Sequence, residues 1–377
     1  MYEFPNVRVE VDPEVCKLYR FDLLKVPKPF SAFIRTPLAV FQPENVKDLL
    51  EILKFAKKRN LPLIPRGAAT SAYGGVVPLK RSLIVDMNRM KNFEVENGKL
   101  IAESGAVWFE IERKINKKGY ALRVYPTSAL VSTVGGWIAQ NGYGIGSLAY
   151  GSIAENVEWL EVVDFEGLKK VSGDELKFYV GAYGTTGIIV KACVKLRKNN
   201  PLGVEAFETS IDKAVEKIDN AYHAAYKNAE KKIFLLARED GESNDLGLKA
   251  WKERFFPLTG YKSTFSNFSE VIVPIESVVD FLSEVEKISK HYQVNFARGE
   301  ATILIILQSR NILKALKIIK IAEKYNGRPF GTGIFFKRKD KDFWDFKKKI
   351  DPKDLLNPKK LKWNLILNFA GLIAWIA

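Results

Sequence analysis

The chain has 377 residues, more than one hydrophobic core usually supports, so two domains are expected. Its net charge of +15 favours anionic partners such as nucleic acid, anionic lipid or acidic small molecules. The two cysteines, Cys16 and Cys193, are far apart and in no CxxC pattern, which argues against a disulfide framework, a zinc ribbon or an iron–sulfur site. The opening MYEFPNVRVEVDPE has no basic region followed by an apolar stretch, so a cytoplasmic location is expected.

The first predicted helix lies in TPLAVFQPENVKDLLEILKFAKKRN. Val46, Leu49, Leu50 and Leu53 recur there at helical spacing, and Pro43 stands near the start. LPLIP follows as a short buried strand, and a glycine-rich stretch then leads to the strand SLIVDM. VWFEIERKINKKG predicts a second amphipathic helix, which Gly119 ends.

Two hairpins and a long strand complete the first half. NFEVENGKLIAESG turns at Asn97-Gly98, the strongest short hairpin signal, and VEWLEVVDFEGLKKVSG turns at Glu166-Gly167. GIIVKACVKLRK is a strand that ends in a basic, proline-containing boundary at residues 199–201.

Beyond this boundary, strands and helices alternate. Residues 207–230 predict a polar helix, which puts His223 on the surface, and KIFLLARED predicts a strand. Two strand–helix pairs follow, SEVIVPIESVVDFLSEVEKISKHY and EATILIILQS with NILKALKIIKIAEKYNG, and His291 is expected to close a helix where a cation suits the dipole. The order predicts a second, α+β domain around a smaller sheet.

Three glycine-rich stretches stand out: PRGAATSAYGG (65–75), PTSALVSTVGGWIAQNGYGIGSLAYG (126–151) and GAYGTTGIIV (181–190). Backbone N–H groups in tight turns form anion-binding concavities, and glycine lets them approach a phosphate closely. Hydroxyls within the stretches could add donors: Thr70, Ser71, Ser132 and Thr133. Ordinary turns are the alternative, but three such stretches favour a large phosphate-bearing ligand.

Two common nucleotide motifs do not account for these stretches. GxxxxGK[ST] is absent, which excludes a P-loop. Residues 142–146 approach G-x-G-x-x-G, but with the wrong spacing and no preceding strand, which disfavours a Rossmann site.

The ordered set of motifs resembles a known family. PENVKDLLEILKFAKKRNLPLIPRGAATSAYGG, then IVDMNRM, PTSALVSTVGGWIAQNGYGIGSLAYGSIAENV and GTTGIIVKACVKL resemble the PCMH-type FAD-binding domain of the vanillyl-alcohol oxidase superfamily, nearest to its glycolate oxidase large subunit and D-lactate dehydrogenase group. The resemblance is dense over residues 36–197 and resumes at DPKDLLNPKK. It implies an α+β fold, with a two-subdomain FAD-binding domain over 1–198, a smaller α+β cap or substrate domain over 199–335, and a segment over 336–377 that returns to the flavin domain.

The resemblance also implies which residues hold FAD. The first stretch would hold the pyrophosphate, the second would line the middle of the flavin, the third would meet the adenine end, and Asn357 would lie near the flavin ring. The implied residues are Pro65, Arg66, Gly67, Ala68, Ala69, Thr70, Ser71, Pro126, Ser132, Thr133, Gly135, Gly136, Gly142, Ser147, Tyr150, Gly187, Ile188, Ile189 and Asn357. The first stretch has no histidine of the kind that commonly links flavin covalently in this superfamily, so non-covalent FAD is expected.

The cap departs from the family pattern. Relatives that oxidise 2-hydroxy acids usually carry cap histidines that bind a metal and take the substrate proton, whereas the corresponding place here reads RPFGTGIFFKRK. No metal site is therefore expected. Arg298, Glu300, Arg328 and Lys337 are candidates to clamp and deprotonate an acidic substrate, with surface salt bridges as the alternative for each.

Two functions remain open. One is an FAD-dependent oxidoreductase that oxidises a glycolate- or D-lactate-type 2-hydroxy acid by hydride transfer to flavin N5 and passes electrons to a quinone, a partner subunit or another carrier. The other is an FAD-binding accessory subunit of a glycolate-oxidase-like complex. Nucleic-acid binding is disfavoured, because the basic residues are not organised with stacking aromatics on a recognisable module.

The C-terminal tail KWNLILNFAGLIAWIA is apolar but shorter than the roughly 20 residues that span a bilayer. Lysines precede it and Trp363 and Trp375 lie near its ends. Three interpretations remain: peripheral contact with an anionic membrane at its inner face, docking on a partner, or completion of the core.

Overall fold

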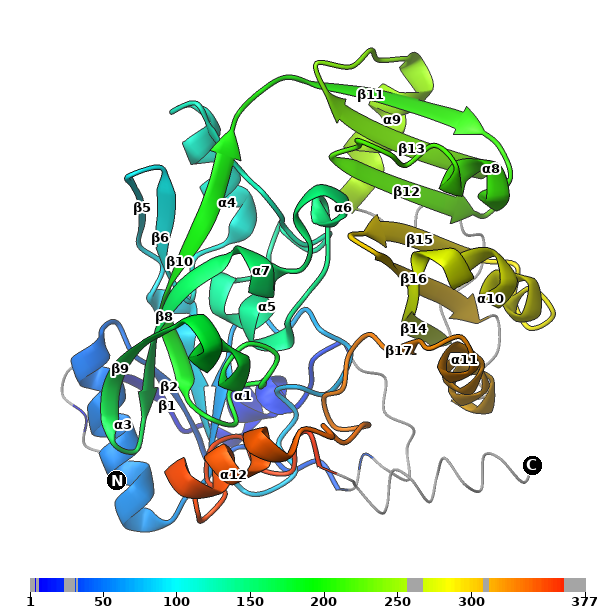
Figure 1. Ribbon diagram of the computed structural model, residues 1–377. Coiled ribbons are helices and arrows are strands. Elements are labelled where there is room, and N and C mark those ends of the chain that lie inside the picture. Colours follow the sequence, from blue (N-terminus) through cyan, green and yellow to red (C-terminus); the bar gives the residue numbers. More distant parts are fainter. Residues whose placement is uncertain are drawn as a thin grey trace.

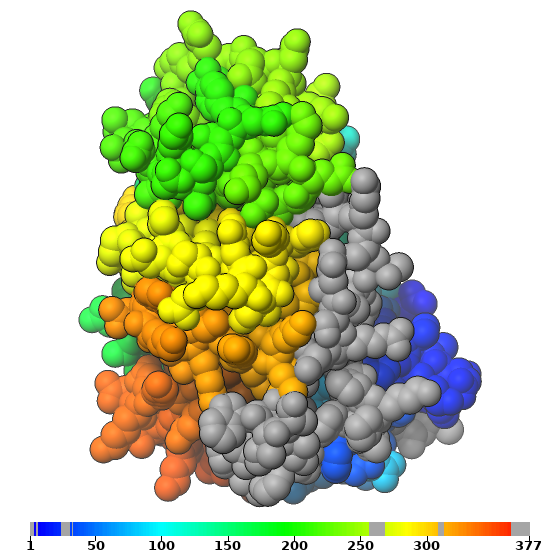
Figure 2. Space-filling model, turned by 90° about the vertical axis from the view of Figure 1, so that its right-hand side faces the viewer, coloured from blue at the N-terminus to red at the C-terminus, as the bar shows by residue number. Residues whose placement is uncertain are grey.

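The computed structural model describes residues 4, 7–23, 31, 33–255, 267–307 and 312–362. They form a mixed α+β fold, as the sequence predicted, and its strands make three sheets. Two sheets are built before residue 199 and the third lies apart from them, joined by the short link after strand β10 (Figure 1). Figure 2 shows the outer side of this third region, with its residues up to 255 (green) above those from 267 onward (yellow to orange).

The first sheet has the strand order β1-β2-β4-β3, and β4 runs parallel to both β2 and β3. Helix α3 begins after Asn45, whose side chain accepts from the N–H of Asp48 at 3.0 Å, and it ends at Asn60 in the left-handed conformation. It buries Leu49, Leu53 and neighbouring apolar residues, as predicted from their spacing. The elements are β1 (Arg8–Glu10), α1 (Pro13–Lys17), β2 (Ala39–Gln42), α3 (Val46–Arg59), β3 (Leu63–Arg66) and β4 (Leu83–Asp86).

The second sheet has the order β5-β6-β10-β8-β9, with β7 paired to β10. Both predicted hairpins are confirmed, because β5 pairs with β6 around residues 97–98 and β8 pairs with β9 around 166–167. The helices of this region pack on the sheet around Trp108 and Trp137, whose rings meet edge to face. The elements are β5 (Phe93–Glu96), β6 (Lys99–Glu103), α4 (Trp108–Asn116), β7 (Tyr120–Leu122), α5 (Val134–Gln140), α6 (Ser147–Tyr150), α7 (Ile153–Asn156), β8 (Val157–Asp164), β9 (Gly167–Ser172) and β10 (Ile188–Lys198).

The third sheet is antiparallel, in the order β11-β13-β12-β15-β16-β14-β17. Its inner strands bury alternate residues such as Val271, Ile303 and Val294 against helices α10 and α11. The elements are β11 (Leu202–Glu208), α8 (Ile211–Val215), β12 (His223–Asn228), β13 (Lys232–Glu239), α9 (Asp245–Lys252), β14 (Asn267–Pro274), α10 (Val278–Val285), β15 (Tyr292–Ala297), β16 (Glu300–Leu307), α11 (Ile312–Lys324) and β17 (Arg328–Pro329).

Four predictions for this region are wrong. Residues 207–230 are not one polar helix but the end of β11, the short α8 and strand β12. His223 is therefore in strand β12 and only 2% exposed, because its ring packs against Trp251. His291 does not close a helix, because α10 ends at Val285 and His291 immediately precedes β15. The third sheet is also not the smaller one, since its seven strands exceed the four and six of the others.

The chain then returns to the first sheet. After α12 (Lys341–Ile350), Leu356 forms a parallel bridge with Leu63, and the N–H of Asn357 donates to the Leu63 carbonyl at 2.7 Å. Short 3-10 helices lie at Leu18–Arg20, Met87–Arg89, Gly173–Phe178, Glu253–Phe255 and Ile275–Ser277. The domain boundaries predicted at residues 198 and 335 stay predictions.

Within the described part of the chain, none of the helices has the length and apolar character needed to cross a bilayer. The tail from residue 363 onward, with its three interpretations, lies outside the described residues.

Candidate cofactor and active site

A cavity of about 630 Å³ lies between the three glycine-rich stretches and one face of the third sheet. Several predicted FAD-binding residues line it together, although they come from distant parts of the chain. These are Pro65, Arg66, Gly67, Ala68, Ala69, Thr70, Ser71, Pro126, Ser132, Thr133, Gly135, Gly136, Ile188 and Ile189. The structure thus brings them into one place, and their role in binding stays a prediction.

The first loop follows β3 and curves tightly. Ala69 adopts φ 54°, a left-handed conformation that turns successive backbone groups toward one side. A Cβ on Gly67 would lie 2.2 Å from Thr133 Oγ1, and one on Gly75 would lie 2.7 Å from the Tyr183 ring. Glycine is required at both positions because the first stretch touches the second and third stretches there.

Buried hydroxyl groups line this cavity. The Oγ atoms of Ser104 and Ser132 and the Oγ1 atom of Thr133 are buried and have no hydrogen-bond partner among the described residues. A buried polar group without a partner costs about 1–3 kcal/mol, so three such groups on residues of one cavity lining indicate a polar ligand. The phosphates and flavin ring edge of FAD carry hydrogen-bonding atoms of this kind, and these residues therefore fit the cofactor.

Arg66 places a cation at the same wall. Its Nη1 atom donates to the Phe21 carbonyl at 3.1 Å, and its guanidinium stacks on the Tyr19 ring. Burial lowers the Arg66 pKa, but a guanidinium keeps its charge at neutral pH. This charge complements a pyrophosphate in the adjoining loop.

The segment after α12 forms hydrogen bonds with the cradle, the name used here for the three glycine-rich stretches that line the cavity. Asn357 is 1% exposed, and its Nδ2 atom donates to the Gly75 carbonyl at 2.8 Å and to the Tyr183 carbonyl at 2.7 Å. Lys360 is also buried and donates to the Val77 carbonyl at 2.7 Å. These contacts hold the first and third stretches in position.

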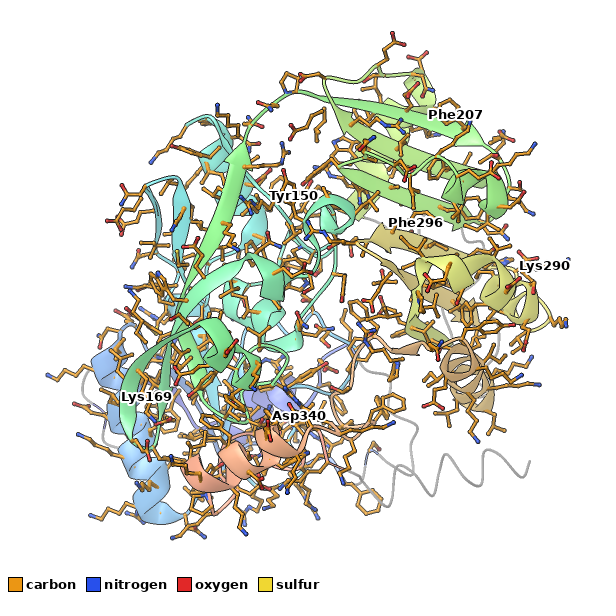
Figure 3. The ribbon with its side chains drawn as sticks, in the orientation of Figure 1. Tyr150, Lys169, Phe207, Lys290, Phe296 and Asp340 are labelled. Atoms are coloured by element: carbon orange, nitrogen blue, oxygen red, sulfur yellow. The ribbon has the colours of Figure 1, made fainter. Side chains whose placement is uncertain are left out.

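Five predicted cofactor residues do not line the cavity: Gly142, Ser147, Tyr150, Gly187 and Asn357. Gly142 packs against the Trp137 indole, and the Ser147 hydroxyl accepts from the N–H of Gly144. Tyr150, the last residue of α6 (Figure 3), packs against Tyr222. Gly187 lies against the Tyr179 ring. Their positions favour structural roles.

The third sheet contributes a wall that the sequence reasoning missed. Asn295 pairs with Thr302 and Glu270 pairs with Leu304 across the sheet, so these side chains share one face. The residues of this wall are Phe268, Glu270, Asn295, Thr302, Leu304 and Phe330. The alternation of side chains in the strand NFSEVIVP could have predicted this wall, because it puts Phe268 and Glu270 on the face opposite the buried valines.

Glu270, in the third sheet, contacts the first glycine-rich stretch. The Tyr73 hydroxyl donates to Glu270 Oε2. Burial raises the Glu270 pKa to about 7, and the hydrogen bond from Tyr73 opposes this shift. Burial likewise raises the pKa of Tyr73, so the phenol stays protonated and donates.

The four predicted catalytic candidates lie outside the cavity lining. Arg328 forms a two-pronged ion pair with Glu300 at 2.5 and 2.9 Å, and Glu300 accepts from the Tyr143 hydroxyl at 2.9 Å. Arg298 pairs with Glu155 at 3.3 Å, and Lys337 is exposed. The Glu300–Arg328 pair therefore links the second stretch, through Tyr143, to the third sheet.

A second cavity, of about 310 Å³, adjoins the first, because Thr127 and Asn295 line both. Arg254 lines it, and the next residue, Phe255, lines the first cavity. His223 also lines it, and burial, with Arg254 nearby, lowers the His223 pKa to about 3. His223 is therefore neutral at physiological pH.

Metal ligands do not cluster in the part of the chain that the structure describes: no three His, Cys, Asp or Glu side chains there could hold an ion together.

Residues 37–171 match a protein-family model described as an FAD binding domain. The chain is 32% identical over 173 residues to the glycolate oxidase subunit GlcD of Bacillus subtilis, covering 42% of this chain and 37% of that protein. It is 32% identical over 203 residues to D-lactate dehydrogenase of Archaeoglobus fulgidus, covering 50% and 44%. The matches thus span less than half the length of these relatives.

The fold has a wider match. A solved structure of alkyldihydroxyacetonephosphate synthase superposes with a TM-score of 0.74, covering 96% of this chain and 84% of that one at 18% identity. At that identity the likeness concerns the fold, and it includes the third sheet as well as the first two.

Proposed function

We propose that the protein is an FAD-dependent oxidoreductase acting on a 2-hydroxy acid, because residues 37–171 match the model of an FAD binding domain. The domain is related to those of the glycolate oxidase subunit GlcD and of D-lactate dehydrogenase, whose names motivate the substrate class. The observation that carries the proposal is the single cavity that joins the glycine-rich cradle to the third sheet. The glycine-rich side of the cavity is where the cofactor would lie, and the side lined by the third sheet is where a substrate would lie beside it.

Different residues of the cavity would bind different parts of the cofactor. The first loop and Arg66 would hold the pyrophosphate, and the hydroxyls of Ser132 and Thr133 would bind polar atoms of the cofactor. The described lining residues include no histidine or cysteine, which supports non-covalent FAD. When bound, FAD supplies the hydride acceptor for the carbinol carbon.

The third sheet would hold the substrate. Phe268, Leu304 and Phe330 form an apolar wall that excludes water, while Asn295 and Thr302 offer hydrogen bonds to orient a hydroxyl or carboxylate. Arg254, which lines the second cavity, is the cation that we propose for the substrate carboxylate, and its Nε and Nη1 atoms donate to the Tyr125 hydroxyl at 3.1 Å and the Trp251 carbonyl at 2.8 Å, which hold the guanidinium in place. An arginine fork suits a carboxylate, and the four cap candidates predicted from the sequence are directed elsewhere.

An absorption spectrum of the purified protein tests the cofactor, and anaerobic reduction tests the reaction. We expect a yellow protein whose flavin is released by acid, and bleaching of the flavin band by at least one of glycolate, D-lactate and other 2-hydroxy acids. A colourless protein that takes up no added FAD would refute cofactor binding. A yellow protein that no member of the panel bleaches would refute the reaction.

An accessory flavoprotein is the second candidate. It is supported by the lack of any histidine among the described lining residues and by the likeness to a named subunit of glycolate oxidase. Here the chain would bind FAD and require a partner chain for activity, to which electrons would pass. Activity that appears only after co-purification with another chain would favour this candidate.

A quinone acceptor at the inner face of the membrane belongs to the first candidate, and restored flavin absorbance on adding a quinone analogue to the reduced protein tests it.

A further inference from the structure

Glu270 is a carboxyl group in the wall that faces the predicted cofactor cradle. It lies in β14, and its face of the sheet is opposite to that of Val271 and Val273, which pack in the core. Its cross-strand partner is Leu304, and its backbone carbonyl accepts from the N–H of Phe330 at 3.0 Å. A charged group among apolar neighbours costs free energy, so a structural need alone would favour an apolar residue here.

Tyr73 holds the Glu270 carboxyl from the opposite side. Tyr73 lies in the first glycine-rich stretch, and its carbonyl accepts from the N–H of Ile334 at 3.0 Å. Gly331 and Gly333 pack so closely that a Cβ on either would clash with Tyr73. The Tyr73 hydroxyl therefore has a fixed position, and it orients the carboxylate without giving it a counter-charge.

The surroundings leave Glu270 suited to accept a proton. Tyr73 is the titratable group against its carboxylate, while Leu304 and Phe330 on the neighbouring strand and loop are apolar. Burial raises the Glu270 pKa to about 7, which is near the optimum for a general base at neutral pH. Tyr143 cannot serve at this pH, because burial and Glu300 raise its pKa to about 12.

We propose that Glu270 is the catalytic base, which accepts the hydroxyl proton of the substrate, and that Tyr73 is its positioning residue. This rests on the proposed oxidation of a 2-hydroxy acid. In this reaction the O–H bond would break as its proton passes to Glu270, and the C–H bond would break as its hydride passes to FAD, the acceptor that the cavity would hold, so that a carbon–oxygen double bond forms. The two electrons leave with the hydride, and Glu270 becomes a neutral carboxylic acid.

Four variants test the proposal by anaerobic stopped-flow reduction across pH. In the wild type we expect the reduction rate to rise with pH and level off above about pH 7, since the base must be deprotonated. E270Q should lower the rate by roughly 10²- to 10⁴-fold at every pH, and E270D should keep part of the rate. Y73F removes a hydrogen bond that lowers the Glu270 pKa and orients its carboxylate, so its rise should move to higher pH and its plateau should be lower than that of the wild type. E276Q is the matched control, because Glu276 is exposed just beyond β14.

A second readout does not depend on turnover. In the FAD-loaded protein without substrate, difference infrared spectroscopy should show a carboxylic acid that titrates near neutral pH, vanishes in E270Q and titrates at higher pH in Y73F. Absence of this band, or reduction by E270Q at the wild-type rate, would overturn the role of Glu270 while leaving the oxidoreductase proposal intact. If the band is present but no 2-hydroxy acid reduces the wild type, the proposed reaction fails, and with it the assignment of Glu270 as its base. Unchanged FAD affinity in E270Q is expected and excludes unfolding as the cause.

Discussion

Asp351 holds together the segment that closes the chain, and its removal should loosen the FAD cradle. Its carboxylate accepts from Lys347 Nζ and from the N–H groups of Leu355 at 2.9 Å and Leu356 at 2.7 Å. The Lys347 and Asp351 side chains are only 5% and 1% exposed. Asp351→Ala therefore leaves a buried ammonium and two N–H groups without this acceptor.

The magnitude follows from that burial. Removing one partner of a buried ion pair costs about 3–5 kcal/mol, a large part of a typical stability of about 5–15 kcal/mol. The remaining contact of Lys347 with Asp354, at 3.4 Å, should keep the loss toward the lower end. Because Asn357 lies in the same segment, we also expect weaker binding of FAD by the cradle.

Urea unfolding measures the free energy, hydrogen exchange over residues 351–362 locates the loosening, and flavin fluorescence reports FAD affinity. Asp345→Asn is the control, since Asp345 is exposed on the same α12 helix. The double variant K347M/D351N should recover part of the loss, because it leaves no unpaired buried charge. A change below about 0.5 kcal/mol in Asp351→Ala, the range of ordinary surface substitutions, would refute the reasoning.

Three further changes have defined outcomes. Gly67→Ala should weaken FAD binding about tenfold or more, equal to about 1.4 kcal/mol, because its Cβ would displace Thr133; unchanged affinity in a fluorescence titration would contradict the tight contact. Burial lowers the Lys360 pKa in the folded protein to about 7, whereas the unfolded chain keeps the ordinary lysine pKa of about 10. Between these pH values the unfolded chain binds one proton more than the folded protein, so the free energy of unfolding should rise with pH in the wild type but not in Lys360→Met. Arg254→Met should raise the KM for a 2-hydroxy acid more than it lowers kcat, and an unchanged KM would exclude Arg254 as the carboxylate site.

Local patterns in the sequence predicted much of the fold. The helix over 46–59, the hairpins at Asn97 and Glu166 and the strand from Ile188 depend on turn chemistry and short-range periodicity, and each is confirmed. The prediction for 207–230 failed because its short apolar run fits both periods. The choice depended on pairing with β13 and β15, which are distant in the sequence.

The same division holds for the site. The sequence by itself determined the glycine-rich cradle, because the need for bare backbone at positions such as Gly67 is written as glycine. Only the tertiary structure decided what faces that cradle. Glu270 is one of many charged residues in the printed sequence, and it gains its raised pKa from burial and its orientation from Tyr73, 197 residues earlier. Conversely, the sequence made Glu300 and Arg328 catalytic candidates, but in the structure they form an ion pair with each other. Glu300 lies in β16 and Arg328 in β17, and both strands flank β14, so the pairing depends on the strand order of the third sheet.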